Sequence, residues 1–237
     1  MKPFKSIRIS LIKGGNIKRY LLYAIGEVLL VMIGISLAFQ ADNWNEDRLK
    51  KDEESNNYQN IRDQIIADKG VIQGQIHFNN RYMAQFKYAY TIIESKDRSK
   101  MDTLGLIIRN LLQYSDFDRQ GNIYETMVNS GEIKILRNHK IVNGIRDLEE
   151  KYIYINRMEN IHYDVGMNHV AAVLNPIINY ATAEIIKPDQ VFNYEFQNIL
   201  TNLLRIMTEK NKVYTEAINK IEAVKVLIDK ELGSNNF

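Results

Sequence analysis

The apolar run at residues 20–39, YLLYAIGEVLLVMIGISLAF, constrains this chain more than any other feature of its sequence. Its only ionisable acid or base is Glu27. At 1.5 Å per residue, a helix of this length extends about 30 Å, which matches the hydrocarbon core of a bilayer. Tyr20 lies at one end and Trp44 just beyond the other, where amphipathic rings prefer the membrane interface. The run therefore predicts a transmembrane helix over residues 20–41.

The charges that flank this run predict its orientation. Residues 1–19 contain no acid, whereas residues 40–56 contain more acids than bases. The positive-inside rule then places residues 1–19 in the cytoplasm and residues 45–237 outside it. Residues 1–19 fit either a short helix on the membrane surface or an unstructured tail. Their positive charge suits the anionic inner leaflet. The basic residues of this segment are Lys2, Lys5, Arg8, Lys13, Lys18 and Arg19.

Two other interpretations of the apolar run fit less well. A cleaved signal peptide is compatible with the small residues Ser36 and Ala38, but the run exceeds the ~7–15 residues of a signal-peptide core. A buried helix of a soluble protein conflicts with the length of the run and with the charge difference between its flanks. We therefore expect an uncleaved anchor.

One side of this anchor carries small residues and the single acid. Because lipid provides no hydrophobic drive between helices, close packing at small residues holds membrane helices together. This side predicts an interface with a second copy or with another membrane protein. The Glu27 carboxyl fits an interhelical hydrogen bond better than a proton or cation path, since this helix has no second Asp, Glu, Lys, Arg or His in the membrane. The predicted interface comprises Glu27, Val31, Gly34, Ala38 and Ala41.

The remaining sequence predicts an all-α fold: a helical bundle with long antiparallel helices outside the cytoplasm. Residues 42–57 are polar on all sides and predict a solvated stalk, which precedes a helical domain at 58–233 and a tail at 234–237. Apolar residues recur every three or four positions from Tyr58 to about Glu94, although Asp68, Gln75 and Asn79 interrupt the pattern. The same spacing occurs again in a second segment, from Phe196 to Ile228, where Lys210 is the only polar residue on the apolar face.

Shorter elements follow from capping and turn residues. Asp102 predicts the N-cap of a helix over 103–114, and SDFDRQG (115–121) predicts a loop. A short helix capped by Asn122 ends at Ser130, where Gly131 suits a left-handed C-cap. Asn138 predicts the cap of a helix that extends toward Leu174, and residues 185–190 around Pro188 predict a loop.

The sequence gives little support to catalysis or to cofactor binding. It contains no cysteine and no glycine-rich phosphate loop. Glu159 and His162 have the spacing of a di-iron ligand pair, with His169 further along the helix, but such a site requires a second pair that is absent. We therefore expect Glu159 and His162 on a solvated helix face, and no metal, cofactor or catalytic residue. Outside the basic segment the chain is mildly acidic, which argues against a nucleic-acid partner.

Four short motifs together resemble a known family. They are Gly26-Glu27, Asn43-Trp44-Asn45-Glu46, Tyr124-Glu125 and Ser130-Gly131. With the basic segment and the anchor, they resemble a family of small Gram-negative single-pass inner-membrane proteins classed as a domain of unknown function. The resemblance implies membrane location and a helical domain, and it implies no activity.

These observations favour a membrane-anchored scaffold or accessory subunit that acts by protein–protein interaction in the cell envelope. Its expected partners are the lipid bilayer, a membrane protein or second copy at the anchor, and an extracytoplasmic protein at the helical domain. A sensor of a ligand or of envelope stress, signalling through a membrane partner, is the alternative. A membrane-tethered hydrolase has the least support.

Overall fold

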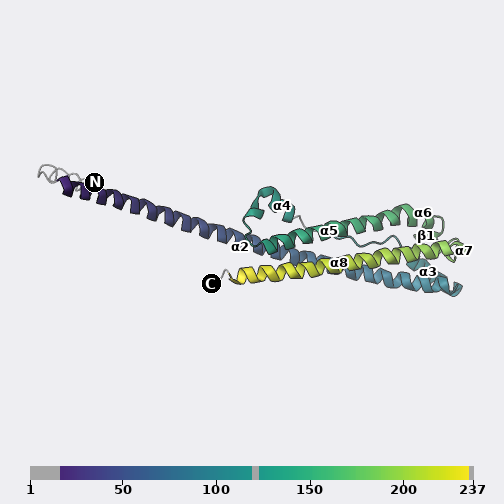
Figure 1. Ribbon diagram of the computed structural model, residues 1–237. Coiled ribbons are helices and arrows are strands. Elements are labelled where there is room, and N and C mark those ends of the chain that lie inside the picture. Colours follow the sequence, from purple (N-terminus) through teal and green to yellow (C-terminus); the bar gives the residue numbers. More distant parts are fainter. Residues whose placement is uncertain (1–16, 119–122, 235–237) are drawn as a thin grey trace. The chain divides into compact units, whose positions relative to one another are not determined.

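The computed structural model describes residues 17–118 and 123–234, without the side chains of Ile17, Arg19, Tyr20, Ile123 and Ser234. The chain is mainly helical, as predicted (Figure 1). Lys2, Lys5, Arg8, Lys13 and the predicted cap Asn122 lie outside the described residues. The elements are α2 (Ile17–Glu94), η1 (Arg98–Lys100), α3 (Met101–Ile108), α4 (Ile123–Ser130), η2 (Glu132–Lys134), α5 (His139–Val165), η3 (Gly166–Val170), α6 (Ala171–Leu174), β1 (Ile178–Asn179), β2 (Glu184–Ile185), α7 (Pro188–Val191) and α8 (Tyr194–Ser234).

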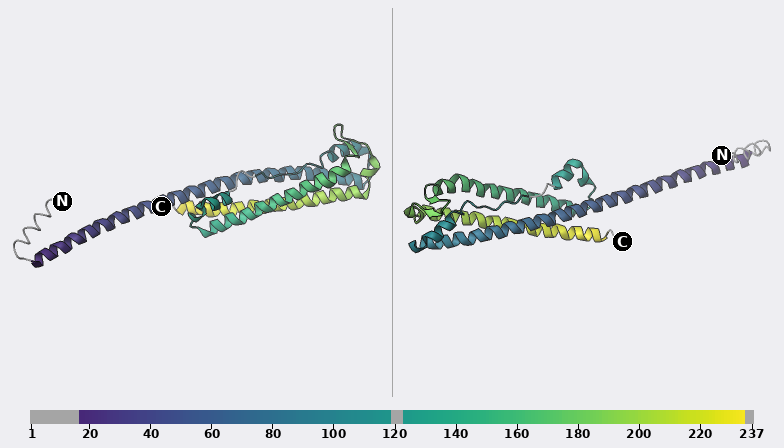
Figure 2. Two further views of the ribbon diagram at one scale, coloured as in Figure 1. Left: turned by 90° about the horizontal axis from the view of Figure 1, so that it is seen from above. Right: turned by 180° about the vertical axis from the view of Figure 1, so that it is seen from behind.

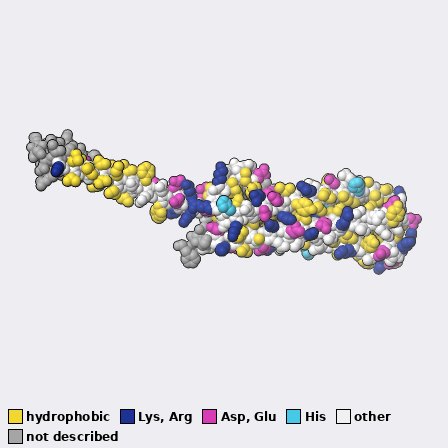
Figure 3. All heavy atoms as spheres, in the orientation of Figure 1, with side chains coloured by type: hydrophobic (Ala, Val, Ile, Leu, Met, Phe, Trp, Pro, Cys, Tyr) yellow, Lys and Arg dark blue, Asp and Glu magenta, His cyan; other side chains and the backbone are white. Residues whose placement is uncertain are grey.

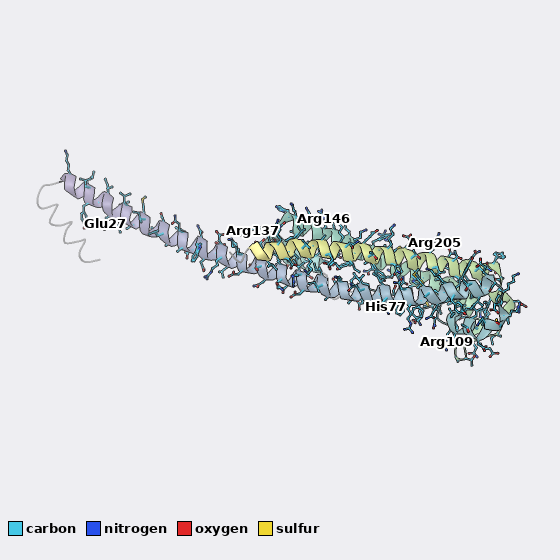
Figure 4. The ribbon with its side chains drawn as sticks, turned by 90° about the horizontal axis from the view of Figure 1, so that it is seen from below. Glu27, His77, Arg109, Arg137, Arg146 and Arg205 are labelled. Carbon is cyan, nitrogen blue, oxygen red and sulfur yellow. The ribbon has the colours of Figure 1, made fainter. Side chains whose placement is uncertain are left out.

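The chain divides into two compact units, Met1–Glu53 and Glu54–Phe237. The described part of the first unit is the beginning of α2, and its apolar side chains are exposed (Figure 3). Among the described residues, α2 is the one helix that is long and apolar enough to cross a membrane, and none of its apolar window is buried. Figure 4 labels Glu27 on this stretch. The helix is therefore confirmed as long and apolar at this end.

In the second unit, α2, α5 and α8 lie side by side (Figures 1 and 2). Residue numbers fall along α8 as they rise along α2, because Arg62 pairs with Asp229 and Lys69 pairs with Glu222. Helix α5 also runs antiparallel to α8, since Lys220 pairs with Asp147 at 2.9 Å and Lys151 pairs with Glu216 at 2.6 Å. Helices α2 and α5 are therefore parallel to each other.

The apolar faces of these helices form two clusters of buried side chains. The first, which we call the hairpin-end cluster, joins the end of α2 and the start of α8 to α3, α6 and the β-hairpin. The second, which we call the Tyr58-end cluster, joins α2 around Tyr58 to α5 and to the second half of α8. The predicted apolar spacing from Tyr58 and from Phe196 thus coincides with the buried faces of α2 and α8. Figure 4 shows Arg146 and Arg205 at the outer surfaces of α5 and α8.

Two predicted caps are confirmed. Gly131 has φ +82° after α4, so it adopts the left-handed conformation that glycine favours at a helix end. The Asn138 side chain accepts hydrogen bonds from the backbone N–H groups of Lys140 and Ile141. The helix that follows reaches Leu174 as predicted, but it contains a π-helical segment at η3.

Three local predictions were wrong. The helix predicted at 103–114 is α3, which ends at Ile108, and Asp102 lies inside its first turn. Asp97 is the residue that caps a helix here, because its side chain accepts from the Ser99 N–H. Residues 185–190 are not a loop, since β2 pairs with β1 and Pro188 begins α7. A two-residue strand is too short to produce the alternating pattern that identifies strands in a sequence.

Candidate functional site

A layer of polar side chains is buried between the two apolar clusters. Helix α5 contributes Glu159 and His162, α8 contributes Lys210 and Tyr214, and the loop after α3 contributes Ser115. Each of these five residues is at most 3% exposed. On α8, Lys210 lies between Met207 of the hairpin-end cluster and Val213 of the Tyr58-end cluster, and Tyr214 belongs both to the layer and to the Tyr58-end cluster. We call these five residues the polar layer.

The Glu159 carboxylate holds the loop to both helices. Its Oε1 atom accepts a hydrogen bond from the Phe117 N–H at 2.8 Å and another from the Tyr214 hydroxyl. The Tyr214 hydroxyl also lies 3.2 Å from Ser115 Oγ. Burial raises the pKa of Glu159, although these two hydrogen bonds and the Lys210 charge act in the opposite direction.

Lys210 completes the layer from the other side. Its Nζ atom donates to the Ser115 carbonyl oxygen at 2.6 Å and lies 3.3 Å from His162 Nδ1. Burial lowers the pKa of Lys210 to about 8, and Glu159 and Asp116 oppose that shift. Burial, together with the Lys210 charge, lowers the pKa of His162 to about 3. His162 is therefore neutral at pH 7, and Nδ1 is the acceptor that faces the ammonium group.

This arrangement is suited to fixing a loop. The side chains of the layer are deeply buried, and Glu159 Oε1 and Lys210 Nζ are bonded to the loop backbone. Because a buried charge that loses its partners is strongly unfavourable, the layer requires the loop at 113–118 to stay in contact with α5 and α8. Its chemistry is electrostatic and structural.

Comparison with known proteins places the chain in a family. A family model described as a family of unknown function, DUF6090, matches residues 27–209. The chain belongs to DUF6090. No curated protein and no solved structure matches it.

The DUF6090 match includes Ser115, Glu159 and His162 but ends immediately before Lys210. It also includes the Tyr124-Glu125 and Ser130-Gly131 motifs, which belong to α4 and to the turn after it. The predicted resemblance to a family of unknown function is therefore confirmed, and the membrane location that it implied stays a prediction.

The structure contradicts the solvated face that we predicted for Glu159 and His162. Both side chains point into the core, whereas His169 is exposed. Within residues 17–118 and 123–234, no three His, Asp or Glu side chains are grouped so as to hold a metal ion. The partner that His162 does have is the Lys210 ammonium group. Helical spacing alone does not indicate which face of α5 is buried, and this produced the error.

The predicted membrane interface lies on α2 within the first unit. Val31, Gly34, Ala38 and Ala41 are exposed, and Glu27 is partly exposed. A Cβ atom added at Gly34 would meet nothing within 4 Å. This surface of the DUF6090 protein is therefore open to a neighbour, and its role as a helix–helix interface stays a prediction.

Sequence reasoning missed Ser115, because an isolated serine in a loop carries no periodic signal. It also missed Glu54, which is buried and accepts from the Arg137 N–H at 2.6 Å and from the Tyr58 hydroxyl at 3.0 Å. The breaks in the apolar pattern of α2 were the available signal. Gln75 Oε1 accepts from the Asp116 N–H at 3.1 Å, and Asn79 donates to the Met207 carbonyl oxygen at 2.8 Å.

Proposed function

We propose that this protein is a single-pass inner-membrane protein that serves as a scaffold or accessory subunit in the cell envelope. Its basic segment lies in the cytoplasm, α2 crosses the bilayer over 20–41, and the helical bundle at 58–233 lies in the periplasm. It acts by protein–protein contact, with one surface on the anchor and another on the helical domain.

The observation that carries this proposal is the exposure of the apolar side chains between Leu21 and Phe39. Burying one large apolar side chain is worth about 1.5–3 kcal/mol, so a run of such residues in water is strongly unfavourable. Nothing in the described chain covers them. Lipid, together with a neighbouring helix, provides the missing cover.

The predicted face of the anchor supports assembly through this helix. Gly34 and Ala38 let a second backbone approach closely, and Glu27 provides a carboxyl that a neighbouring helix can hydrogen-bond. Since a side chain at Gly34 would meet nothing within this chain, a substitution there changes contacts with other helices and leaves this chain's own packing intact.

Topology is tested first, with single cysteines in a chain that has none. Lys18→Cys marks the basic flank, and Asn219→Cys marks the exposed surface of α8. In intact spheroplasts, a membrane-impermeant maleimide should label the Asn219→Cys chain alone, and Lys18→Cys should react only after lysis. Labelling of Lys18→Cys in intact spheroplasts would contradict the proposed orientation.

Assembly is then tested by extracting the protein from its native membrane in mild detergent and measuring the particle mass with its co-purifying proteins. We expect a particle larger than one chain, which persists in Glu27→Gln and is lost in Gly34→Ile. Two copies that pack through this face should also form a disulfide crosslink when each carries Gly34→Cys. Met32→Cys lies on the opposite side of the helix, so it is the matched control for this crosslinking. An unchanged particle mass in Gly34→Ile would contradict packing through this face.

A sensor is the second candidate, and the polar layer favours it. Its ionisable groups fix the loop at 113–118 inside the domain, so the stability of that loop depends on the charges around it. A ligand-dependent rise in the unfolding temperature of the extracted protein would favour the sensor over the scaffold. A hydrolase has less support, because Ser115 Oγ faces Tyr214 rather than His162.

A further inference from the structure

The β-hairpin is held against α3 by a close backbone contact. A Cβ atom added at Gly105 would lie 2.0 Å from the Ala183 carbonyl oxygen, so only glycine admits the hairpin at this distance. Ala183 itself has φ +61°, which is unusual for a residue other than glycine. A residue held in this conformation persists where its surroundings determine it. The hairpin therefore lies closely against α3 and forms a wall beside it.

A pocket of about 350 Å³ lies beside this contact. Its volume is at the lower end of the range of pockets that bind small molecules, roughly 300–1,000 Å³. Ile185 and Ala183 are buried, Met101 is half-buried, and Leu106 is 51% exposed although it belongs to the apolar part of the lining. The pocket is lined by Met101, Asp102, Leu106, Thr182, Ala183, Glu184 and Ile185.

The charged groups of the lining are both acidic and come from two different elements. Asp102 belongs to α3 and Glu184 belongs to β2, and both are exposed. In the described part of the chain, no ion pair is formed by either carboxylate. The nearby Arg98 is engaged elsewhere, because it pairs with Asp189 and its guanidinium lies 5.2 Å from the Phe192 ring centroid.

We propose that this pocket binds an alkyl cation, that is, an ammonium or guanidinium group on a short aliphatic chain. The cation lies between the Asp102 and Glu184 carboxylates, and the aliphatic chain packs against Leu106 and Ile185. A free amine and a lysine or arginine side chain of another protein have this chemistry in common. The inference does not depend on the membrane anchor, because all of the lining residues belong to the unit Glu54–Phe237.

The test uses Thr182→Cys in the full chain, reconstituted in lipid nanodiscs. Thr182 lines the pocket and is exposed, so its replacement reports access to the site. Reaction with cationic aminoethyl methanethiosulfonate is compared with reaction with the neutral methyl reagent. We expect the ratio of the two rates to exceed the ratio at Thr215→Cys, an exposed position on α8. Asp102→Asn should lower the ratio roughly fivefold, which corresponds to about 1 kcal/mol for one charge pair in water.

Ligand binding is measured as protection of the same cysteine. Millimolar n-butylammonium should slow modification by the neutral reagent, and n-butanol should not. Protection should be lost when Asp102→Asn and Glu184→Gln are combined, and it should persist in Glu209→Gln, an exposed carboxylate on α8. Circular dichroism confirms that each variant is folded.

The source of the cation is distinguished with the peptide acetyl-Leu-Lys-amide. Protection at lower concentration by the peptide than by n-butylammonium assigns the site to a side chain of a partner protein, and the reverse assigns it to a small amine. Equal protection by n-butanol, protection that survives loss of both carboxylates, or no protection by either cation would overturn the proposal.

Discussion

Leu30 and Ile72 lie in the same helix, α2, yet Leu30 is 71% exposed and Ile72 is 0% exposed. The two side chains are similarly apolar, so the difference comes from their neighbours. Helices α5 and α8 contribute to the cluster that covers Ile72, and nothing in the described chain covers Leu30. The first part of α2 carries apolar residues on every side, whereas the second part confines them to one face. Hydrophobic residues in this protein therefore occur in two different settings, covered by other helices in one region and left exposed by the described chain in the other.

Polar groups differ between the two regions in a corresponding way. The anchor sequence has one acid in twenty residues, while the interior of the domain contains a lysine, a histidine and a glutamate in one layer. The domain tolerates these groups because the loop at 113–118 supplies backbone partners for Glu159 and Lys210, and Lys210 in turn faces His162. A carboxyl within lipid is costly for the same reason that a buried one is, so we expect Glu27 to face protein rather than lipid.

The largest expected effect comes from truncating one large apolar side chain in each region and comparing the free energies of unfolding. Phe86→Ala removes a buried ring from the hairpin-end cluster and should lower the free energy of unfolding by about 3–5 kcal/mol. Leu30→Ala removes a side chain of the anchor and should leave that free energy unchanged. Urea titration of the full chain in micelles, followed by circular dichroism, measures both. A comparable loss in the two variants would show that the anchor packs onto the domain.

A smaller effect is expected from a matched pair of glycines. Gly105→Ala forces a Cβ atom against the Ala183 carbonyl oxygen and should destabilise the domain by about 1–3 kcal/mol. Gly34→Ala meets nothing within 4 Å and should have no effect on domain unfolding. The same urea titration compares them. Equal stability of the two variants would contradict the close contact between α3 and the hairpin.

The smallest expected effect concerns pH. His162 titrates near its usual pKa of about 6.5 when unfolded but has a folded pKa of about 3, so the unfolded chain binds more protons between these values. Its contribution to stability is therefore lost as pH falls below about 6.5, and the loss between pH 8 and pH 5.5 should be about 1 kcal/mol. Glu159 acts in the opposite direction, because its raised pKa favours proton uptake by the folded state.

Variants measured over the same pH range distinguish the contribution of His162 to stability from that of Glu159. In the Glu159→Gln chain the opposing contribution is absent, so the loss of stability on acidification should be steeper than in the unmodified chain. Adding His162→Gln should remove the part of that loss that comes from the imidazole, about 1 kcal/mol, and keep an acceptor for Lys210. A loss that is unchanged by His162→Gln would show that the imidazole is not held neutral by the layer.

Much of the helical framework could be predicted from sequence, because amphipathic spacing depends on residues close together in the chain. The buried faces from Tyr58 and from Phe196, and the caps at Gly131 and Asn138, follow from such local rules. The end of α3 at Ile108 could not be predicted, since the apolar residues that follow it enter the core from a turn.

The polar layer could be predicted only in fragments. Lys210 was recognised as the one polar residue in an apolar face, and Gln75 and Asn79 as breaks in another, but their partners lie on other elements. Glu159 and His162 were placed on the wrong face for the same reason. Buried polar residues are recognised by partners distant in sequence, and a local pattern shows only that the apolar run is interrupted.

The pairing of Arg62 with Asp229 joins residues separated by 167 positions, which has a consequence for synthesis. At the usual rates of translation, α8 emerges from the ribosome on the order of 10–30 s after the start of the domain. During that interval the apolar stripe of α2 that includes Ile61 and Ile72 has no α8 to cover it. The nascent chain therefore passes through a period in which this stripe is exposed, and that period ends only when its final long helix arrives.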